Sequence, residues 1–213
     1  MQPIPLIKCH TAVVILNYNG HFFLEKFLPS LIKYTHQAEL IIIDNASTDD
    51  SVHFLKTKYS DIPIIQNPDN QGFSKGYNTG LKQIEAEYYV LLNSDVELSP
   101  NWIEPLLNLM ENNPEIAACQ PKIKAECEKT SFEAAGAAGG FIDKWGFPFC
   151  RGRIFDHLEQ DEGQYDTNIE VFWASGACLL IRAKLYHEMG GLDEDFFAHM
   201  EEIDLCWRLK NAG

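Results

Sequence analysis

The sequence predicts an α/β protein built on a doubly wound, mostly parallel sheet, and three observations support this prediction. Short apolar runs rich in β-branched residues recur through the first half of the chain, as is typical of strands buried on both faces. Segments with the apolar spacing of helices separate these runs, and this alternation indicates βαβ units. With 213 residues, 46% of them hydrophobic, the chain can bury the core of one domain, which excludes disorder of the whole chain.

The first half is predicted to hold five strands that alternate with four helices. Pro29 lies inside the first helix and should kink or split it. The second helix follows a polar, acidic start that suits a helix cap, and Ser99-Pro100 place a cap and a proline where the fourth should begin. The expected strands cover residues 12–16, 40–43, 62–65, 88–92 and 116–119, and the expected helices cover residues 21–34, 51–59, 72–84 and about 99–112.

The second half has a different character. Residues 122–170 are rich in glycine and scattered aromatics, which indicates either loops or a small antiparallel excursion. A strand is expected over residues 171–181 with a break at Ser175-Gly176, followed by a short helix over 183–189 that Gly190-Gly191 should end, and a last helix over 201–210. We expect one domain over residues 1–213, with two halves that meet near residue 121.

Composition narrows the possible partners. The chain carries 31 acidic against 17 basic side chains, a net charge of −14, which argues against binding nucleic acid through its phosphates. The six cysteines form no C-x-x-C pair and are expected as small buried side chains in a reducing compartment. We recognise no secretory signal and no apolar run of the roughly 20 residues needed to span a bilayer. These features predict a cytoplasmic protein.

Polar residues follow four of the expected strands. The carboxyl ends of parallel strands meet at one edge of an open α/β sheet, where ligands bind. Each asparagine or aspartate alone is as readily explained as a turn former, but four strand ends together favour a polar pocket. The residues concerned are Asn17, Tyr18 and Asn19, then Asp44 and Asn45, then residues 67–70, and finally Asn93, Ser94 and Asp95.

Two common nucleotide-binding motifs are absent: the sequence has neither the dinucleotide fingerprint G-x-G-x-x-G after its first strand nor the phosphate loop G-x-x-x-x-G-K-[ST]. Asp95 and Glu97 should lie on the same side of an extended segment. Two such carboxylates suit a hard divalent cation that shares its coordination with phosphate. Simple solvation of either carboxylate is the alternative.

Glycines recur every four residues at Gly72, Gly76 and Gly80 and would form one bare face of the third helix. Close packing of that helix on the sheet explains them. A ligand approaching the start of the helix, with Lys75 near its phosphate, explains them as well. The two explanations are compatible.

A cluster of acidic residues lies near the end of the chain, beside the apolar residues 196–198. It is explained either by a solvated acidic helix start or by a general base, since burial beside aromatic side chains raises the pKa of a carboxyl group. The cluster consists of Asp193, Asp195, Glu201, Glu202 and Asp204, with His199 among them.

Six segments of the chain, in order and over nearly its whole length, resemble the inverting family 2 glycosyltransferases of the GT-A type, in the rhamnosyltransferase-like branch. The resemblance implies a Rossmann-like fold whose first half, about 1–121, binds the nucleotide and whose second half, about 122–213, holds the acceptor and the catalytic base. The segments are residues 13–19, 43–49, 70–80, 91–95, 175–182 and 190–208.

The resemblance implies a role for each of these segments. Asn17 and Tyr18 would line the base pocket, and Asp44 would hydrogen-bond the base. Asn93-Ser94-Asp95 stands in the place of the D-x-D motif, so Asp95 would bind Mg²⁺ or Mn²⁺; His199 would touch the metal or the diphosphate, or simply pack beside Phe196 and Phe197. Further donor contacts would come from Asn19, Asn45, Gly72, Lys75, Asn78, Asn93 and Ser94, and Trp173, Ser175 and Gly176 would border the acceptor and the donor sugar.

One position departs from the family. Its members typically have Glu-Asp where this chain has Glu201-Glu202, and the aspartate of that pair is taken as the base. Glu202 is then the expected base, with a side chain one methylene longer; Glu201 comes second and Asp204 third. Reduced activity is the other outcome that this departure allows.

The expected activity is metal-dependent, inverting transfer of a sugar from a nucleotide-diphosphate sugar, with uridine or thymidine as the nucleoside, to a hydroxyl of a glycan or lipid-linked acceptor. A binding module of the same fold that has lost turnover is the alternative. A nucleotidyltransferase is less favoured, because it should carry a glycine-rich basic loop after the first strand, where this chain has Asn17-Tyr18-Asn19.

The charge sharpens the expectation. An anionic donor on a chain with a net charge of −14 needs a cation, or local donors such as Lys75, Arg151 and Arg153. Because family members often continue past such a last helix, we expect the chain to be truncated at its C-terminus. The missing part would provide peripheral association with the inner face of the cytoplasmic membrane.

Overall fold

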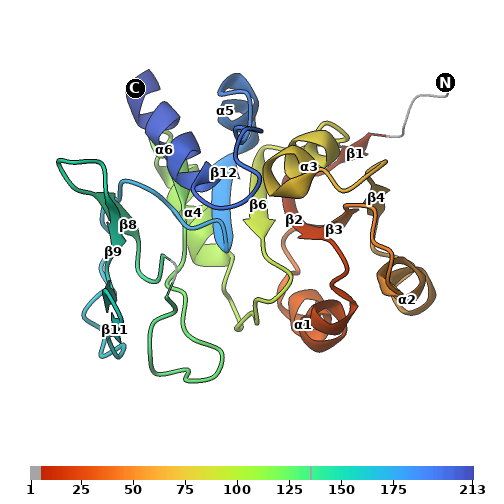
Figure 1. The fold of residues 1–213 in the computed structure, drawn as a ribbon, viewed down its shortest axis with the longest axis horizontal. Coiled ribbons are helices and arrows are strands. Elements are labelled where there is room, and N and C mark those ends of the chain that lie inside the picture. Colours follow the sequence, from red (N-terminus) through yellow and green to blue (C-terminus); the bar gives the residue numbers. More distant parts are fainter. Residues whose placement is uncertain (1–5, 135) are drawn as a thin grey trace.

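A central six-stranded sheet organises the molecule (Figure 1). The computed structural model describes residues 6–134 and 136–213. The strands run in the order β4-β3-β2-β6-β12-β7; the first four are mutually parallel, and β12 is antiparallel to both of its neighbours. The predicted α/β class with a mostly parallel sheet and an antiparallel part is therefore confirmed. The bounds are β2 Thr11–Asn17, β3 Glu39–Asp44, β4 Ile64–Gln66, β6 Tyr88–Leu92, β7 Ala118–Cys119 and β12 Cys178–Arg182.

Helices cover both faces of the sheet. Alternate residues of β2 point to opposite faces, as the pleat requires, so that Ala12 and Val14 join one core cluster while Val13 and Ile15 join the other. The first cluster lies under α3, α5 and α6, and the second under α1, α2 and α4 (Figure 1). The bounds are α1 His21–Tyr34, α2 Ser51–Lys58, α3 Gly72–Leu81, α4 Glu104–Asn112, α5 Ala183–Glu188 and α6 Glu201–Ala212.

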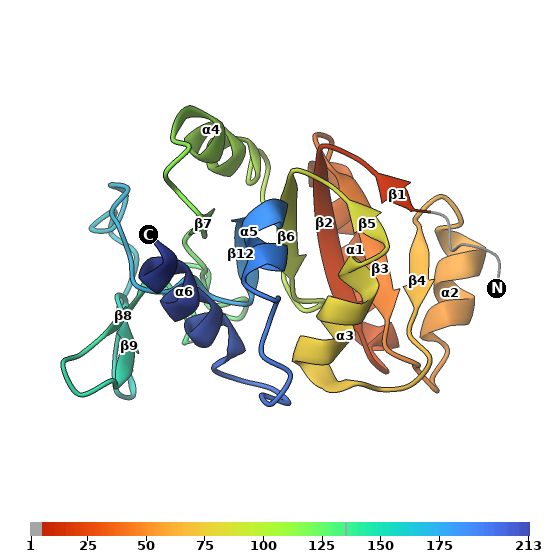
Figure 2. The same ribbon diagram turned by 90° about the horizontal axis from the view of Figure 1, so that it is seen from above.

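Three small strand pairs lie outside the main sheet. β1 (Ile7–Lys8) pairs with β5 (Ile84–Glu85) in parallel. The glycine-rich region forms two antiparallel hairpins, β8 (Gly140–Ile142) with β9 (Pro148–Cys150), and β10 (Arg153–Ile154) with β11 (His157–Leu158). This is the antiparallel excursion that the sequence allowed. Figure 2 shows the β8–β9 hairpin at the end of the molecule opposite β4.

Two helix predictions need correction. α1 is not split at Pro29: the helix continues through this exposed position, with Leu28 and Leu31 buried in the core, and the kink stays a prediction. α4 begins at Glu104 with Pro105 in its first turn, five residues after Ser99. The preceding turn is held by Trp102, which is buried and whose Nε1 donates to the carbonyl oxygen of Tyr34 at 3.1 Å.

Several element bounds are also shorter than predicted. α3 ends at Leu81 so that Ile84 can pair with Ile7. The expected strands over 62–65 and 116–119 are reduced to Ile64–Gln66 and Ala118–Cys119. β12 begins only at Cys178, because Ser175 Oγ accepts from the amide of Ala177 and closes a turn before it. No helix in the described parts of the chain is long and apolar enough to cross a membrane.

Candidate active site

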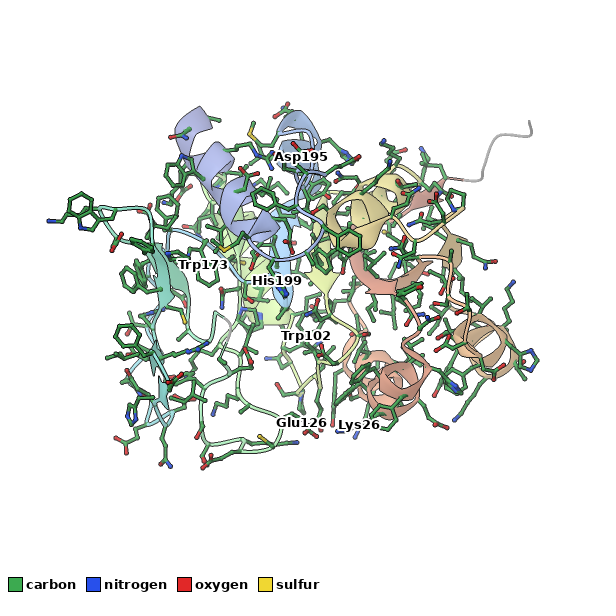
Figure 3. The ribbon with its side chains drawn as sticks, in the orientation of Figure 1. Lys26, Trp102, Glu126, Trp173, Asp195 and His199 are labelled. Carbon is green, nitrogen blue, oxygen red and sulfur yellow. The ribbon has the colours of Figure 1, made fainter. Side chains whose placement is uncertain are left out.

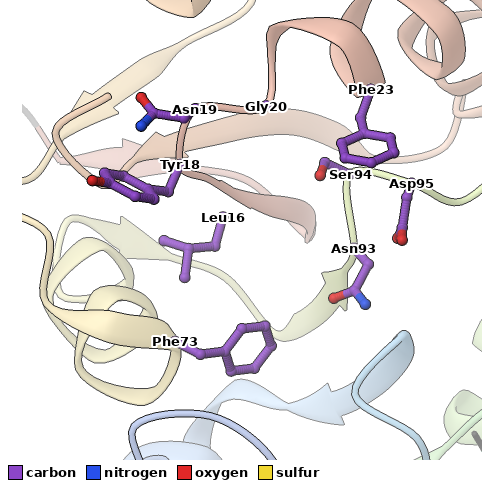
Figure 4. Close-up of a pocket in the computed structure, with 9 residues that line it drawn as sticks. All are labelled: Leu16, Tyr18, Asn19, Gly20, Phe23, Phe73, Asn93, Ser94 and Asp95. Atoms are coloured by element: carbon purple, nitrogen blue, oxygen red, sulfur yellow. The ribbon is translucent and has the colours of Figure 1, made fainter. Parts of the chain in front are cut away.

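A pocket of about 290 Å³ opens where the ends of β2 and β6 meet (Figure 4). The predicted convergence of polar residues at this edge is therefore seen for two of the four strand ends. Phe23 and Phe73 add aromatic walls that the sequence analysis missed; their only sequence signal is that each stands a few residues beyond a polar strand end. The lining residues are Leu16, Tyr18, Asn19, Gly20, Phe23, Phe73, Asn93, Ser94 and Asp95.

Asn17 and Asp44 lie beneath the pocket and are fully buried. Asn17 Nδ2 donates to Asp44 Oδ1 at 3.1 Å and to Ser47 Oγ at 3.0 Å, and the other oxygen of Asp44 accepts from the amide of Ser47. These contacts join the loops that follow β2 and β3. The expected contacts of Asn17 and Asp44 with a nucleotide base stay a prediction.

Tyr18 and Asn19 form the outer rim of the pocket. The Tyr18 side chain is about half exposed. Asn19 has a left-handed backbone (φ 50°), and its Oδ1 accepts from the amides of Thr48 and Asp49. The rim is thus fixed from the loop after β3, which leaves the Tyr18 ring as its adaptable part.

Asn45 organises the loop that leads into α3. Its Nδ2 donates to Asn70 Oδ1 and to the carbonyl of Gly72, both at 2.9 Å, and its Oδ1 accepts from Asn67 Nδ2 at 2.9 Å. These bonds join the strand ends after β3 and β4 to the start of α3, while Asn67 Oδ1 has no partner among the described residues and Asn70 lies exposed. This network accounts for why residues 67–70 are not among the pocket lining.

The bare face of α3 packs directly on the sheet. A Cβ at Gly80 would overlap the side chain of Ile43, and one at Gly76 would lie 3.1 Å from Asn45, so the packing explanation of the glycine repeat is confirmed. Gly72 has a φ of 72° and supports the ring of Phe197. Lys75 lies exposed on the outer side of this helix, and its expected contact with phosphate stays a prediction.

Asn78 connects α3 to the segment before the acidic cluster. Its Nδ2 donates to the Leu192 carbonyl at 2.8 Å, and its Oδ1 accepts from Tyr186 Oη at 2.6 Å and from the Leu192 amide at 3.1 Å. Phe73 adds a second tie, since its amide donates to the Phe197 carbonyl at 3.0 Å. The expected contact of Asn78 with the donor stays a prediction.

The two carboxylates after β6 separate. Asp95 is exposed on the wall of the pocket, whereas Glu97 pairs with Lys129. No three His, Cys, Asp or Glu side chains gather as a metal cage within residues 6–134 and 136–213. Mg²⁺ commonly binds one or two carboxylates together with substrate phosphates and does not require such a cage, so a single pocket carboxylate fits the expected metal.

The segment before β12 lies beside the pocket. The Asn93 amide donates to the Ala177 carbonyl at 3.1 Å, and the Ser175 amide donates to Gln120 Oε1 at 2.7 Å. Trp173 is buried, packs on Gly140 and donates through Nε1 to the Phe141 carbonyl at 3.0 Å. Gly176 lies next to Glu202: a Cβ at position 176 would be 3.8 Å from Glu202 Cδ, an ordinary contact distance.

Glu201 and Glu202 begin α6, where the helix dipole favours acidic side chains. Burial raises the pKa of both carboxyl groups, and the charge of Glu202 adds to the effect on Glu201. The backbone amides of Glu202 and Gly176 offset part of the rise for Glu202. In each residue, Oε2 has no hydrogen-bond partner among the described residues, so both carboxyls keep an acceptor available.

The third acid of this helix has a different environment. Asp204 Oδ2 accepts from Arg208 Nε at 2.8 Å and from Nη2 at 2.7 Å. Arg208 in turn donates to the carbonyls of Met189 and Gly191. Asp204 is therefore part of a structural ion pair, which agrees with its place behind Glu202 and Glu201 as the expected base.

The residues that lead into α6 have an unusual backbone. His199 and Met200 both have left-handed conformations, with φ of 72° and 74°, which non-glycine residues adopt rarely and often at functional sites. His199 is exposed and lies centrally in the view of Figure 3. Its positive form would favour ionisation of both glutamates. Whether it binds a metal stays a prediction.

Known proteins resemble this chain at the level of both sequence and fold. The family model described as glycosyl transferase family 2 matches residues 12–190. The chain is 27% identical over 218 residues to the N-acetylglucosaminyl-diphospho-decaprenol L-rhamnosyltransferase of Mycobacterium tuberculosis, which covers 94% of this chain and 70% of that protein.

Two solved structures share the fold. Residues 1–349 of TarS from S. aureus superpose with a TM-score of 0.65 at 15% identity, over 94% of this chain and 55% of theirs. The mannosyltransferase PcManGT from Pyrobaculum calidifontis, in complex with GDP-Man and Mn²⁺, gives a TM-score of 0.62 at 14% identity, over 96% and 53%. The chain spans about half the length of these solved chains, and the expected GT-A fold is confirmed.

Proposed function

The chain belongs to glycosyl transferase family 2, and on that premise we propose that it is a metal-dependent inverting glycosyltransferase. It would move a sugar from a nucleotide-diphosphate sugar to a hydroxyl of a glycan or lipid-linked acceptor. The observation that carries the proposal is the position of Glu202: a largely buried carboxyl with an unpartnered oxygen, in contact distance of Gly176, whose neighbour Ala177 is hydrogen-bonded to Asn93 of the Asp95 pocket.

The reaction needs a base on one side of the sugar and a stabilised leaving group on the other. Glu202 would take the proton of the acceptor hydroxyl as its oxygen attacks the anomeric carbon. The bond from that carbon to the diphosphate oxygen breaks, and the nucleoside diphosphate leaves with its electron pair. A single displacement inverts the carbon through an oxocarbenium-like transition state, and no enzyme nucleophile is required.

Asp95 would hold the divalent cation, Mg²⁺ or Mn²⁺, together with the diphosphate of the donor, and His199 is the second candidate ligand. When bound, such a cation stabilises the charge that builds on the departing diphosphate. The lining of the pocket supports this assignment, because among the described residues it contains no lysine or arginine and Asp95 is its charged member. A diphosphate beside Asp95 would be repelled without a cation.

The local basic residues considered from the sequence do not replace the metal. Arg151 Nε donates to the Ala138 carbonyl while its guanidinium stacks over Tyr165, and Arg153 donates to the carbonyls of Ala134 and Phe155. Both therefore brace the hairpin region. Lys75 is left as the candidate for a direct contact with phosphate.

We assign the donor to the uridine or thymidine diphosphate sugars and place the protein in the cytoplasm, at the inner face of the membrane. The name of the M. tuberculosis relative includes a decaprenyl diphosphate carrier and L-rhamnose, which supports a lipid-linked acceptor and a deoxyhexose donor. Ser175 and Gly176 would border the acceptor and the donor sugar. Trp173 would act from behind this segment, since its ring is buried.

Release of nucleoside diphosphate from a panel of nucleotide sugars, with and without Mn²⁺, tests the activity. Glu202→Gln should lower turnover by about 10²–10⁴-fold, the usual contribution of a general base, while Glu202→Asp restores the acid typical of the family and should retain turnover. A metal-dependent donor complex without turnover, unchanged by Glu202→Gln, would instead establish the binding-module alternative that the glutamate at 202 allows.

A further inference from the structure

The β8–β9 hairpin presents large aromatic side chains to solvent. Trp145 is 75% exposed, Phe147 69% and Phe149 52%. Isolated exposed apolar residues are ordinary, but three exposed aromatic residues at alternate positions of one hairpin suggest an interaction surface. The next hairpin along the chain, β10–β11, adds exposed Ile154 and Phe155. Trp145, Phe147 and Phe149 of β8–β9 are called the hairpin surface below.

The hairpin holds this surface in a defined shape. Asp143 Oδ1 accepts from the amides of Trp145 and Phe147, at 2.8 and 2.9 Å, and closes the turn between the strands. Phe149 stacks on Phe141 of the paired strand, with ring centroids 5.7 Å apart. The aromatic side chains are therefore presented by an ordered turn and need little ordering on binding.

The charge of this region differs from that of the rest of the protein. Residues 136–158 contain three basic and two acidic side chains, a net charge of +1, on a chain whose net charge is −14. One of the two acids, Asp143, is engaged in the turn, and Lys144 lies over the Trp145 ring at 5.1 Å. At physiological salt the Debye length is about 8 Å, so a partner at the hairpin surface is affected mainly by the charged side chains next to it, of which Lys144 beside Trp145 is the cation.

The shape and residue types favour a bilayer over a folded protein or a free glycan. Both hairpins lie at the end of the molecule opposite β4 (Figures 1 and 2). Trp145 and Phe147 stand on a turn, and side chains in that position can contact a flat partner surface more easily than a concave one. Tryptophan and phenylalanine next to lysine suit the membrane interface, where the rings enter the acyl boundary and the lysine stays at the headgroups.

The hairpin is also joined to the acceptor side of the site. The Gly140 amide donates to the Trp173 carbonyl at 3.0 Å, and Trp173 Nε1 donates back to the Phe141 carbonyl at 3.0 Å. Trp173 stands three residues before Gly176, beside Glu202. These hydrogen bonds therefore connect the β8–β9 hairpin, through Trp173, to the segment that contacts the proposed base Glu202.

We propose that the hairpin surface docks on the interface of an anionic lipid bilayer and so presents Glu202 to an acceptor carried in that bilayer. This assignment rests on the proposed function for its acceptor, but the docking itself does not require turnover. The contact is made by Trp145, Phe147 and Phe149 of the β8–β9 hairpin.

Binding of the intact chain to phosphatidylcholine vesicles, with and without phosphatidylglycerol, tests the docking by co-sedimentation. The double variant Trp145→Ala/Phe147→Ala should lower the partition coefficient at least about tenfold, the scale expected for removing two aromatic side chains from an apolar contact. Phe22→Ala is the matched control, because Phe22 is 69% exposed like Phe147 but lies on α1. Trp145 fluorescence should shift to shorter wavelength on vesicles, and Trp145→Phe should remove the shift.

The outcomes separate the two proposals. Equal vesicle binding by the double variant and the parent overturns the docking, as does a loss of turnover by the double variant on a water-soluble acceptor, which would make the hairpin a glycan subsite. Vesicle binding that depends on Trp145 and Phe147, in a protein that releases no nucleoside diphosphate from any donor, supports the docking and counts against the proposed function alone.

Discussion

Lys26 Nζ on α1 donates a hydrogen bond of 2.9 Å to Glu126 Oε1, which lies 100 positions further along the chain (Figure 3). A second pair, Glu97 with Lys129, joins the same loop to the segment that carries Asp95. Two surface ion pairs thus tie residues 126–129 to the first half of the chain, one at α1 and one at the segment after β6.

Breaking this tie should loosen the loop without unfolding the protein. Exposed ion pairs contribute little to global stability, so the Lys26→Ala/Lys129→Ala variant should melt near the parent. Amide hydrogen exchange in residues 124–131 should become several-fold faster, because local opening needs fewer contacts to break. Lys8→Ala, which removes another exposed surface pair, that with Glu85, is the control and should leave this loop unchanged. Equal exchange in all three proteins would show that the pairs do not hold the loop.

The acid limb of turnover should report Glu202. A general base must be ionised, so kcat/KM falls as the pH drops through the pKa of that group. Because burial raises the pKa of Glu202 above its ordinary value of 4.5, the midpoint of the acid limb should lie above pH 4.5. The pH profile of kcat/KM, measured for the parent and for Glu202→Asp, checks this. If the midpoint of the acid limb is the same in both proteins, another residue is the base.

Donor binding should depend on a divalent cation through Asp95. Asp95→Asn removes the charge that would share the cation with the diphosphate, so the donor Kd should rise at least about tenfold, a loss comparable to one charge-assisted contact. Chelation should produce a loss of the same order in the parent and little more in the variant. Glu97→Gln is the matched control two residues away, outside the pocket lining. Calorimetric titration measures the donor Kd of the parent and of both variants, with and without a chelator. Donor binding that is unaffected by chelation would contradict the role given to Asp95.

The layers of this fold follow from local sequence patterns, whereas the allocation of its asparagines does not. The β-branched runs at β2, β3 and β6 and the polar residues at their ends are local signals, and they place Asn93 and Asp95 at the pocket. Asn45, Asn67 and Asn70 look the same in sequence, yet they bond to one another. That choice is made by tertiary packing, which sequence spacing does not encode.

Charged residues show the same limit. Glu97 has the spacing of a second metal ligand, but its partner is Lys129, 32 residues away. The start of α4 was misplaced for a related reason, since a buried Trp102 bonded to Tyr34 holds the turn that Ser99-Pro100 would otherwise open as a helix. In contrast, acids at a helix start beside apolar residues are a local pattern, and this pattern predicted the acidic first turn of α6 in which burial raises the pKa of Glu201 and Glu202.

Asp161 should stabilise the second half in a pH-dependent way. It accepts from Lys122 at 3.0 Å and pairs with Lys124 at 2.7 Å, and Lys124 and Lys122 lower its pKa to about 2. A carboxyl with a lowered pKa in the folded state stabilises it above the unfolded value of 3.8, and this stability is lost as the pH falls toward 2.

Asp161→Asn should therefore lower the unfolding free energy on the order of 1–2 kcal/mol at pH 7, the scale of a hydrogen bond to a charged group. The difference from the parent should shrink between about pH 4 and pH 2. Urea unfolding at several pH values measures it. Asp166→Asn, which removes the other and more exposed partner of Lys122, should have a smaller effect. Equal effects of the two substitutions would contradict the particular contribution of Asp161 to stability.

Gly176 offers a test of the site that separates function from folding. A Cβ at this position would lie 3.8 Å from the Cβ and Cδ of Glu202, which is ordinary contact, and the residue has no left-handed backbone. Gly176→Ala should therefore leave the melting temperature nearly unchanged. The added methyl group would occupy the space beside the proposed base where an acceptor hydroxyl must approach, and a displacement of about 1 Å there can lower the rate by 10²-fold.

Gly80→Ala is the contrasting control, because its Cβ would overlap Ile43 in the core and should lower stability first. Turnover and thermal melting of both variants decide the matter: a Gly176→Ala protein that is fully active would move the acceptor away from Glu202 and with it the assignment of the base.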